Sequence, residues 1–261
     1  MESMKKKNSN LKNRFLVLAL IVSVMFSCLA INETVYAAAN NPTQAETMKF
    51  GKDKLGTFSQ SDENEQFHYY KFTTPKIAGI DYTVRGTYTD EGDGRRINVR
   101  LMNDNYEFMR TDGIADATWY TSFSLSNAGQ TGSMTYSNLE PGATYYVWVR
   151  LDGRCKSGGD SYAVCVKQNV IKPSTPVIKN IKPGKKQIKV SYYKTKLATR
   201  YQIQIKKSGG SWKTYNNGKD LNRTIKNLEK GKYYVRIRAQ RKVNGKWYSS
   251  KWSANTKVKV K

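Results

Sequence analysis

Short runs of alternating apolar and polar residues, separated by turn residues about every ten positions, cover most of this chain. A clear example is YYVRIRAQRK, which begins at Tyr233, and no segment keeps a helical period over three turns. Successive side chains of a strand point to opposite faces of a sheet, so such runs are typical of half-buried β-strands. The pattern therefore predicts an all-β chain made of β-sandwich domains.

The first 38 residues have the pattern of a secretory signal peptide. A basic flank, MKKKNSNLKNR, precedes the apolar run FLVLALIVSVMFSCLAI, and small residues follow where a signal peptidase cleaves. We expect cleavage after Ala37 or Ala39, which makes the protein secreted and extracellular or cell-wall associated, with no membrane contact afterwards. The alternative is an uncleaved signal anchor, because the apolar run is nearly long enough to span a bilayer.

Charge divides the rest of the chain into two parts. Residues 40–170 hold 14 Lys or Arg and 16 Asp or Glu, a formal charge of −2, whereas residues 171–261 hold 26 and 2, a formal charge of +24. The stretch between them, KQNVIKPSTPVIKNIKPG, contains three prolines and little alternation, which is typical of a short stiff linker. We therefore predict one sandwich over residues 40–169, a linker at residues 170–176 and a second sandwich over residues 175–261.

The second predicted domain contains enough strands for an immunoglobulin-like sandwich. Its candidate strands are PVIKNI, QIKVSYYK, RYQIQIKK, WKTYN, RTIKNL, YYVRIRAQRK and TKVKVK. The alternation points Tyr233, Val235, Ile237 and Ala239 inward and places Tyr233 where a tyrosine corner belongs.

The runs QIKVSYY, RYQIQIKK, NLEKGKYYVRIRA and KWS occur in the order found in fibronectin type III modules of secreted Gram-positive proteins. Residues 175–261 resemble that family over their whole length. The resemblance implies an immunoglobulin-like fold, with Tyr192 at the position where the family usually has a core Trp.

A similar stretch occurs in the first predicted domain, where NLEPGATYYVWVR begins at Asn138; the second domain has NLEKGKYYVRIRA from Asn227. Alternation points Tyr145 and the next three alternate residues inward. The runs HYYKFTT, NVRLMNDN and LEPGATYYVWV resemble the bacterial pre-peptidase C-terminal domain, a jelly-roll-like sandwich of secreted peptidases and collagenases. This resemblance spans residues 45–168, so we interpret the repeated stretch as convergence on one device, a Gly turn that delivers a Tyr into a central strand.

Two cysteines follow the predicted signal peptide. In an oxidising compartment Cys155 and Cys165 can pair across CKSGGDSYAVC. Closing that loop would stabilise the fold by about 2–3 kcal/mol. The alternative is two free, half-buried thiols, and no His lies nearby to make either one catalytic.

Residues with catalytic potential are scarce. The single histidine, His68, lies within the alternating run QFHYYKF, which is typical of an ordinary strand residue. The sequence has no nucleophile elbow, zinc-binding motif or phosphate-binding glycine loop. We therefore predict a non-catalytic protein with no cofactor and no assigned metal site.

Acidic residues in several loops offer oxygen ligands that Ca²⁺ prefers. The cluster TDEGDGRR contains Asp90, Glu91 and Asp93, and later loops contain Asp104, Asp112 and Asp116. The spacing does not fit an EF-hand, and EGDG is also what a plain hairpin turn requires. Calcium binding at Asp90 and Asp93 stays open at this point.

Cationic residues of the second sandwich form the main candidate binding site. Alternation places these side chains on the outer face of one sheet: Arg200, Lys206, Arg236, Arg238, Lys257 and Lys259. Like charges that face each other across strands destabilise a sheet unless anions bind them. We therefore expect attachment to an anionic cell-wall polymer or polysaccharide, with nucleic acid bound only non-specifically. The alternative is a basic surface that only keeps the domain soluble.

Aromatic residues of the first sandwich form a second candidate site. Trp119, Tyr146 and Trp148 could stack on sugar rings, and Trp148 lies on the polar side of its strand. The alternative is that a loop or the neighbouring domain covers the ring.

Together these features predict a monomeric binding protein whose N-terminal sandwich binds a ligand or acts as a spacer. Two alternatives are an adhesin that recognises a matrix or host protein and an accessory carbohydrate-binding module.

Overall fold

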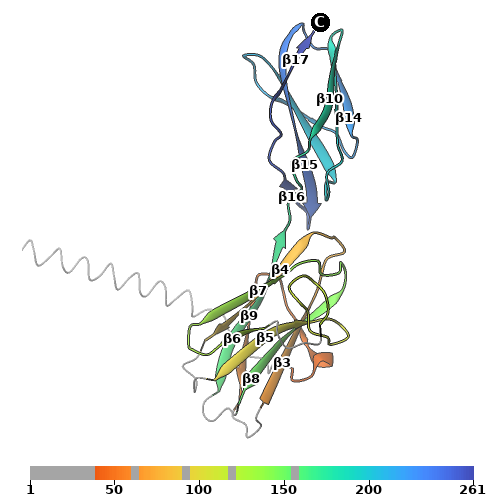
Figure 1. Ribbon diagram of the computed structural model, residues 1–261. Coiled ribbons are helices and arrows are strands. Elements are labelled where there is room, and N and C mark those ends of the chain that lie inside the picture. Colours follow the sequence, from red (N-terminus) through yellow and green to blue (C-terminus); the bar gives the residue numbers. More distant parts are fainter. Residues whose placement is uncertain (1–38, 60–64, 90–94, 117–121, 154–158) are drawn as a thin grey trace, which may run out of the picture. The chain divides into compact units, whose positions relative to one another are not determined.

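In a computed structural model the chain is built almost entirely from β-strands, which confirms the all-β prediction (Figure 1). The structure describes residues 39–59, 65–89, 95–116, 122–153 and 159–261. These residues form one short 3-10 helix, Pro42–Gln44, and 17 strands in four sheets. The predicted signal peptide lies outside the described residues. Within the described part of the chain we find no helix with the length and apolar character needed to cross a membrane.

The first sandwich contains nine strands. They are β1 (Glu46–Thr47), β2 (Asp53–Phe58), β3 (Glu65–Thr73), β4 (Ile80–Tyr88), β5 (Arg96–Met102), β6 (Phe123–Leu125), β7 (Thr131–Tyr136), β8 (Thr144–Asp152) and β9 (Asp160–Val170). One sheet has the order β1-β3-β8-β5-β6 and the other has the order β2-β9-β4-β7 (Figure 1). Consecutive strands often belong to different sheets, so the chain crosses between the two layers several times.

The core of the first sandwich lies between its two sheets, as the two-residue period of the strands requires. On β8 the inward residues Tyr145, Val147, Val149 and Leu151 are all buried, as predicted. Buried residues of β4 and β9 belong to the same cluster, including Val84. Each sheet therefore contributes one apolar face to a shared core.

The second sandwich contains eight strands. They are β10 (Ile178–Gly184), β11 (Gln187–Tyr192), β12 (Arg200–Lys207), β13 (Lys213–Asn216), β14 (Asn222–Lys226), β15 (Gly231–Val243), β16 (Lys246–Ser249) and β17 (Thr256–Val260). One sheet has the order β10-β11-β14; in the other the order is β13-β12-β15-β16, and β17 also pairs with β15. This is the three-plus-four arrangement of an immunoglobulin-like sandwich of fibronectin type III kind, with the last strand broken into β16 and β17.

The seven strands predicted from the pattern are all present, and β16 is the strand that the pattern missed. It forms a hairpin with the end of β15 across Asn244 and Gly245, which both have positive φ angles of 48° and 79°. An Asn-Gly pair with this backbone is the strongest short-range signal for a two-residue hairpin turn. The run VNGKW in the sequence therefore indicates the turn between β15 and β16.

Both copies of the repeated stretch form similar loops, the second one residue shorter than the first. Asn138 and Asn227 have left-handed backbones, with φ angles of 58° and 60°. The Tyr233 hydroxyl donates to the Glu229 carbonyl oxygen at 3.0 Å, which confirms the tyrosine corner. In the first sandwich the Glu140 N–H donates to the Tyr145 hydroxyl at 2.9 Å. In both sandwiches the hydroxyl of the inward Tyr therefore bonds to the backbone of the loop. This bond links the loop to the start of the strand that follows it.

Tyr192 occupies a core position in the second sandwich with its polar group satisfied. Its ring lies 4.9 Å from the ring of Tyr201, and the side chain is only 3% exposed. The hydroxyl donates to the Asp220 carbonyl oxygen at 2.8 Å and accepts from Asn217 Nδ2 at 2.7 Å. A buried Tyr at this position is stable because the loop supplies both hydrogen-bond partners.

His68 lies inside the first sandwich, in a small polar cluster. Its Nδ1 lies 2.6 Å from the Tyr162 hydroxyl, which is 3.1 Å from the Tyr70 hydroxyl. The Phe58 ring stacks on the imidazole with 4.1 Å between centroids. Burial disfavours the charged imidazolium and lowers the pKa of His68 to about 4. The His68 side chain is therefore part of the interior packing of the first sandwich, as expected for an ordinary strand residue.

We expect the first sandwich to lose stability between about pH 6.5 and pH 4 because the unfolded chain protonates His68 before the folded chain does. The loss should be on the order of 3 kcal/mol, from a pKa difference of about 2.5 units. Replacing His68 with Gln keeps a hydrogen-bonding side chain and removes the titration. Denaturant unfolding at pH 7 and at pH 4.5 should show a smaller pH effect in His68→Gln. An equal pH effect in both proteins would show that His68 is not the titrating group.

Candidate functional site

The sheet that contains β12 and β15 brings four cations into a regular arrangement on its outer face. These strands pair antiparallel, with Arg200 opposite Gln240, Gln202 opposite Arg238, Gln204 opposite Arg236 and Lys206 opposite Tyr234. Each of these four residue pairs holds one cation, and we call them cation rows. Successive rows are two residues apart along the strands, which is about 6.8 Å.

Glutamine side chains hold the three guanidinium groups of the cation rows in place. Within each row the Arg Nε donates to the Gln Oε1 across the strand pair, at 2.7 Å for Arg200 and 2.8 Å for both Arg236 and Arg238. A Gln oxygen is neutral, so these bonds fix the orientation of each guanidinium without cancelling its charge. The terminal guanidinium nitrogens keep their donor capacity.

Two tryptophans each approach cations of two successive rows. Trp252 lies 4.9 Å from Arg236 and 4.5 Å from Arg238, and Trp212 lies 4.1 Å from Arg236 and 5.0 Å from Lys206. The result is an alternating series of side chains, Lys206, Trp212, Arg236, Trp252 and Arg238, which we call the cation–indole stack. Each of these two rings therefore lies within cation–π distance of two cations of the face.

The remaining row has an aromatic partner of its own. The Arg200 guanidinium lies 3.5 Å from the centroid of Trp247, which Lys242 also approaches at 5.9 Å. Trp247 is 39% exposed, so this end of the face is more open than the stack. Every cation of the four rows therefore rests on an aromatic ring.

No carboxylate neutralises the cation rows within residues 171–261, all of which the structure describes. The acidic side chains of this segment are Asp220 and Glu229, and the ion pair described there joins Glu229 to Lys207 outside the rows. Burial is the main cause that lowers the pKa of Arg238, and repulsion from Arg200 and Arg236 lowers it further. The face thus carries closely spaced positive charge that its own sandwich does not compensate.

Lysines of β17 and β15 extend the face, because Lys257 joins the fourth row and Lys232 and Lys259 lie one step beyond it. Lys257 lies opposite Tyr234 and Lys259 lies opposite Lys232. Lys206 and Lys257 both approach the Tyr234 ring, at 5.7 Å and 5.9 Å. Side chains of this region line a hollow: Ser208, Lys232, Tyr233, Tyr234, Lys257, Val258 and Lys259. The structure therefore brings all six predicted polymer-binding residues onto neighbouring strands of one sheet face.

The sequence did not reveal the roles of Trp212, Trp252 and the three glutamines. Their contacts join residues far apart in the chain, so they depend on the register between β12 and β15. One signal was present, because Trp212, Thr214 and Asn216 share the parity of the outward residues on their strand. That parity predicts on which face of the sheet the Trp212 ring lies. It does not predict which cations contact the ring.

The aromatic site predicted around Trp148 is not an exposed platform. Trp148 is only 5% exposed, because Phe67 and Phe108 pack against it at 5.6 Å and 5.3 Å and the Arg100 guanidinium lies 5.4 Å from its ring. Phe108 comes from the loop after β5, which covers this part of the sheet. The exposed-ring hypothesis is therefore wrong for Trp148, and the alternative of loop coverage holds.

The other two aromatic residues of that predicted site do not restore it. Tyr146 is partly exposed and packs against Tyr106 at 5.3 Å, and Trp119 lies outside the described residues. The described part of the predicted site is therefore a packed aromatic cluster with Tyr106 and Tyr146 at its edge.

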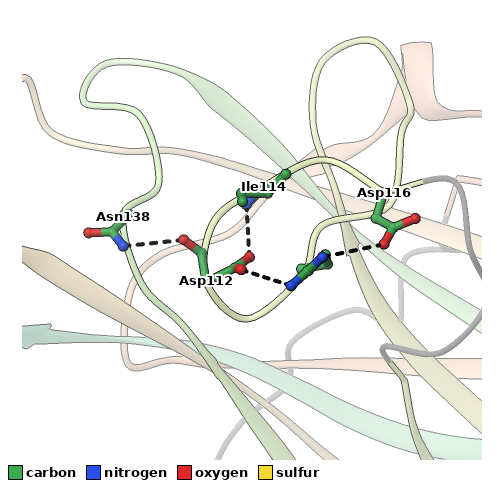
Figure 2. Close-up of polar contacts among 5 residues, drawn as sticks. Asp112, Ile114, Asp116 and Asn138 are labelled. Atoms are coloured by element: carbon green, nitrogen blue, oxygen red, sulfur yellow. Dashed lines mark hydrogen bonds and ion pairs between the residues drawn. The ribbon is translucent and has the colours of Figure 1, made fainter.

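Acidic side chains of the loop after β5 pair with an arginine (Figure 2). Arg110 binds Asp112 at 3.0 Å and approaches Asp116 at 4.0 Å. Asp112 also accepts from the Ile114 N–H at 3.2 Å, and its carbonyl oxygen accepts from Asn138 Nδ2 at 3.2 Å. Among the described residues no group of three His, Cys, Asp or Glu is placed to hold a metal ion. Asp90 and Asp93 lie outside the described residues.

Cys165 is a buried free thiol in the middle of β9. It lies between β2 and β4, in register with Asp53 and Arg85. As a free thiol, Cys165 does not form the predicted disulfide in this structure, and Cys155 lies outside the described residues.

The fold and the site define an all-β protein of two sandwiches, the second of which is fibronectin type III-like and has one basic sheet face. Among similar solved structures, the FN5 domain of Drosophila Lar matches at 21% identity over 34% of this chain and 96% of that domain, with a TM-score of 0.29. The adhesin domain of Epf from Streptococcus pyogenes matches at 13% identity over 80% of this chain and 76% of that domain, with a TM-score of 0.42.

A β-1,2-glucanase from Parabacteroides distasonis matches at 10% identity over 79% of this chain, with a TM-score of 0.31, and this chain covers only 34% of that enzyme. No family model matches the chain, and no curated protein matches it. Similarity at these TM-scores carries no functional argument, so the class rests on the strand order and register described above.

Removing one ring of the cation–indole stack should destabilise the second sandwich. We expect Trp252→Ala to lower the free energy of unfolding by about 2 kcal/mol, because two cation–π contacts of about 0.5–1 kcal/mol each and buried ring area are lost. The matched change Trp247→Ala also removes two cation contacts, but it should cost about 1 kcal/mol or less, since that ring is the more exposed of the two. Denaturant unfolding measures both values, and equal costs would contradict the stack as a stabilising unit.

Proposed function

We propose that this chain is a secreted or cell-surface, non-catalytic binding protein whose second sandwich attaches to an anionic polymer of the cell wall or extracellular matrix. The supporting observation is the single sheet face that holds four cation rows together with Lys257 and Lys259. Within the fully described residues 171–261 these cations face no carboxylate partner. A polymer that carries many negative charges complements such a face at several points at once.

The regular arrangement of the face favours binding over simple solubility. Lysines that only keep a domain soluble need no fixed positions. The cation rows differ from such lysines because glutamines and indole rings hold each Arg in a defined orientation. The opposite sheet provides the contrast, since Lys182, Lys189 and Lys226 are exposed lysines on β10, β11 and β14.

The first sandwich acts in this proposal as a ligand-binding or spacer module. Its formal charge over residues 40–170 is −2, so it adds little to polyanion binding. His68 is buried among Phe58, Tyr70 and Tyr162, where a substrate has no access, which supports a non-catalytic role.

Neutralising lysines of the basic face should release the protein from anionic polymer. We expect Lys232→Gln/Lys257→Gln/Lys259→Gln to weaken sedimentation with purified Gram-positive cell walls at least tenfold at low salt. The dependence of log affinity on log salt should become shallower by about 2, because three cations that pair with the polymer are lost at about 0.7 each.

The matched control removes the same charge from the opposite sheet. Lys182→Gln/Lys189→Gln/Lys226→Gln should keep affinity within about twofold and keep the salt dependence, since those lysines lie outside the proposed face. Walls stripped of their anionic polymers should retain neither protein. Equal weakening by both triple variants would mean that only net charge matters, and retention on stripped walls would point to a different ligand.

A further inference from the structure

We infer that the polymer bound by the basic face is a linear chain of polyol units joined by phosphodiesters, which lies along β12 and β15 with about one phosphate per cation row. This inference rests on the proposed function and names its ligand class. It follows from the spacing of the rows, from the contacts of the aromatic rings with the protein's own cations, and from the lysine-lined hollow at the end of the rows.

The cation rows follow one another at a regular interval along the strands. Arg200, Arg238, Arg236 and Lys206 follow one another along the strand direction, each in its own row. The rows therefore repeat every two residues, or about 6.8 Å along the strands, over about 20 Å in total. A ligand that matches this pattern needs a negative charge at the same regular interval.

A phosphodiester polymer of a three-carbon polyol has that interval. Each repeat contains six skeletal bonds, from one phosphorus through O–C–C–C–O to the next. Three skeletal bonds of an extended peptide span about 3.5 Å, so six span about 7 Å. One phosphate can then meet one cation in every row without stretching or folding the polymer. Polysaccharides with one carboxylate per disaccharide have charges farther apart than the rows.

The aromatic rings distinguish this polymer from single-stranded nucleic acid, whose backbone also has six skeletal bonds per phosphate. Proteins that bind single strands stack bases on aromatic side chains. Here Trp212 and Trp252 each lie within cation–π distance of two of the protein's own cations, and two cations also approach Trp247. The rings are therefore engaged in holding the cations, and a ligand without bases fits the face better.

The hollow beyond the fourth row continues the same pattern. Lys232 and Lys259 lie opposite each other one two-residue step after Tyr234 and Lys257. Both lysines line the hollow, together with the hydroxyl-bearing residues Ser208 and Tyr234. A further phosphate of the same polymer would meet two ammonium groups and neighbouring hydroxyls there.

Polymer selectivity provides the first test. Poly(glycerol phosphate), oligothymidylate and hyaluronate, each with the same number of charges, are titrated against the full chain at several salt concentrations. We expect poly(glycerol phosphate) to bind at least tenfold more tightly than the other two. Tighter binding of oligothymidylate would overturn the inference in favour of nucleic acid. Equal binding of all three would also overturn it, while leaving the proposed attachment to polyanions in place.

A pair of variants with identical net charge tests the row spacing itself. Thr214 and Asn216 are exposed neighbours on β13 that face Gln204 and Gln202, so they extend two adjacent rows. Arg236→Gln/Thr214→Arg moves a cation within its own row, whereas Arg236→Gln/Asn216→Arg empties that row and puts two cations in the next. Both variants lose the same contacts of Arg236 with the indole rings.

We expect the within-row variant to bind poly(glycerol phosphate) within about threefold of the unaltered protein. The variant with an empty row should bind at least tenfold more weakly. Unfolding curves establish that both variants are folded, and the selectivity measurement on the unaltered protein stands if either is not. Equal affinities of the two folded variants would overturn the one-phosphate-per-row register.

Discussion

Pairing between β12 and β15 is the interaction on which both the core and the basic face of the second sandwich depend. The register that buries Ile203, Ile205, Val235 and Ile237 in the core also sets the four cation rows on the opposite face. A slip of one residue would expose these apolar side chains and turn the cations inward. Hydrophobic burial therefore fixes the spacing of the charges, and no separate interaction is needed to set it.

The cation–indole stack explains how the face persists without carboxylates. Two cations about 6.8 Å apart repel by about 0.6 kcal/mol in water and by about 2.4 kcal/mol at an effective dielectric constant of 20. A cation–π contact contributes about 0.5–2 kcal/mol, and Arg236 and Arg238 together make three such contacts. These magnitudes are comparable, so the rings offset much of the repulsion while the charges stay in place for an external anion.

What could be predicted from the sequence follows from which interactions are local. The two-residue period correctly predicted the inward residues of β8 and β15, and the Leu-Glu loop predicted the tyrosine corner at Tyr233. Coverage of Trp148 by Phe108 was not predictable, because it depends on how the loop after β5 folds over the sheet. The stack was missed for the same reason, since Trp252 reaches Arg236 only after three strands have paired. Local sequence patterns therefore predict the strands and turns. The side-chain contacts of the candidate sites depend on the register between strands that are distant in the sequence.

The repeated loop shows how far such local similarity extends. In both sandwiches a left-handed Asn begins the loop, a Gly with positive φ lies just before or at the start of the strand, and the inward Tyr binds the backbone of the loop glutamate. The strand that follows, β8 or β15, pairs with neighbours on both sides, so a slip in its register would disrupt two strand pairs together. A loop that fixes where this strand begins is useful in any sandwich, whatever its strand order. The sequence similarity is therefore explained by a shared mechanical requirement, and it implies neither a duplicated domain nor a shared ligand.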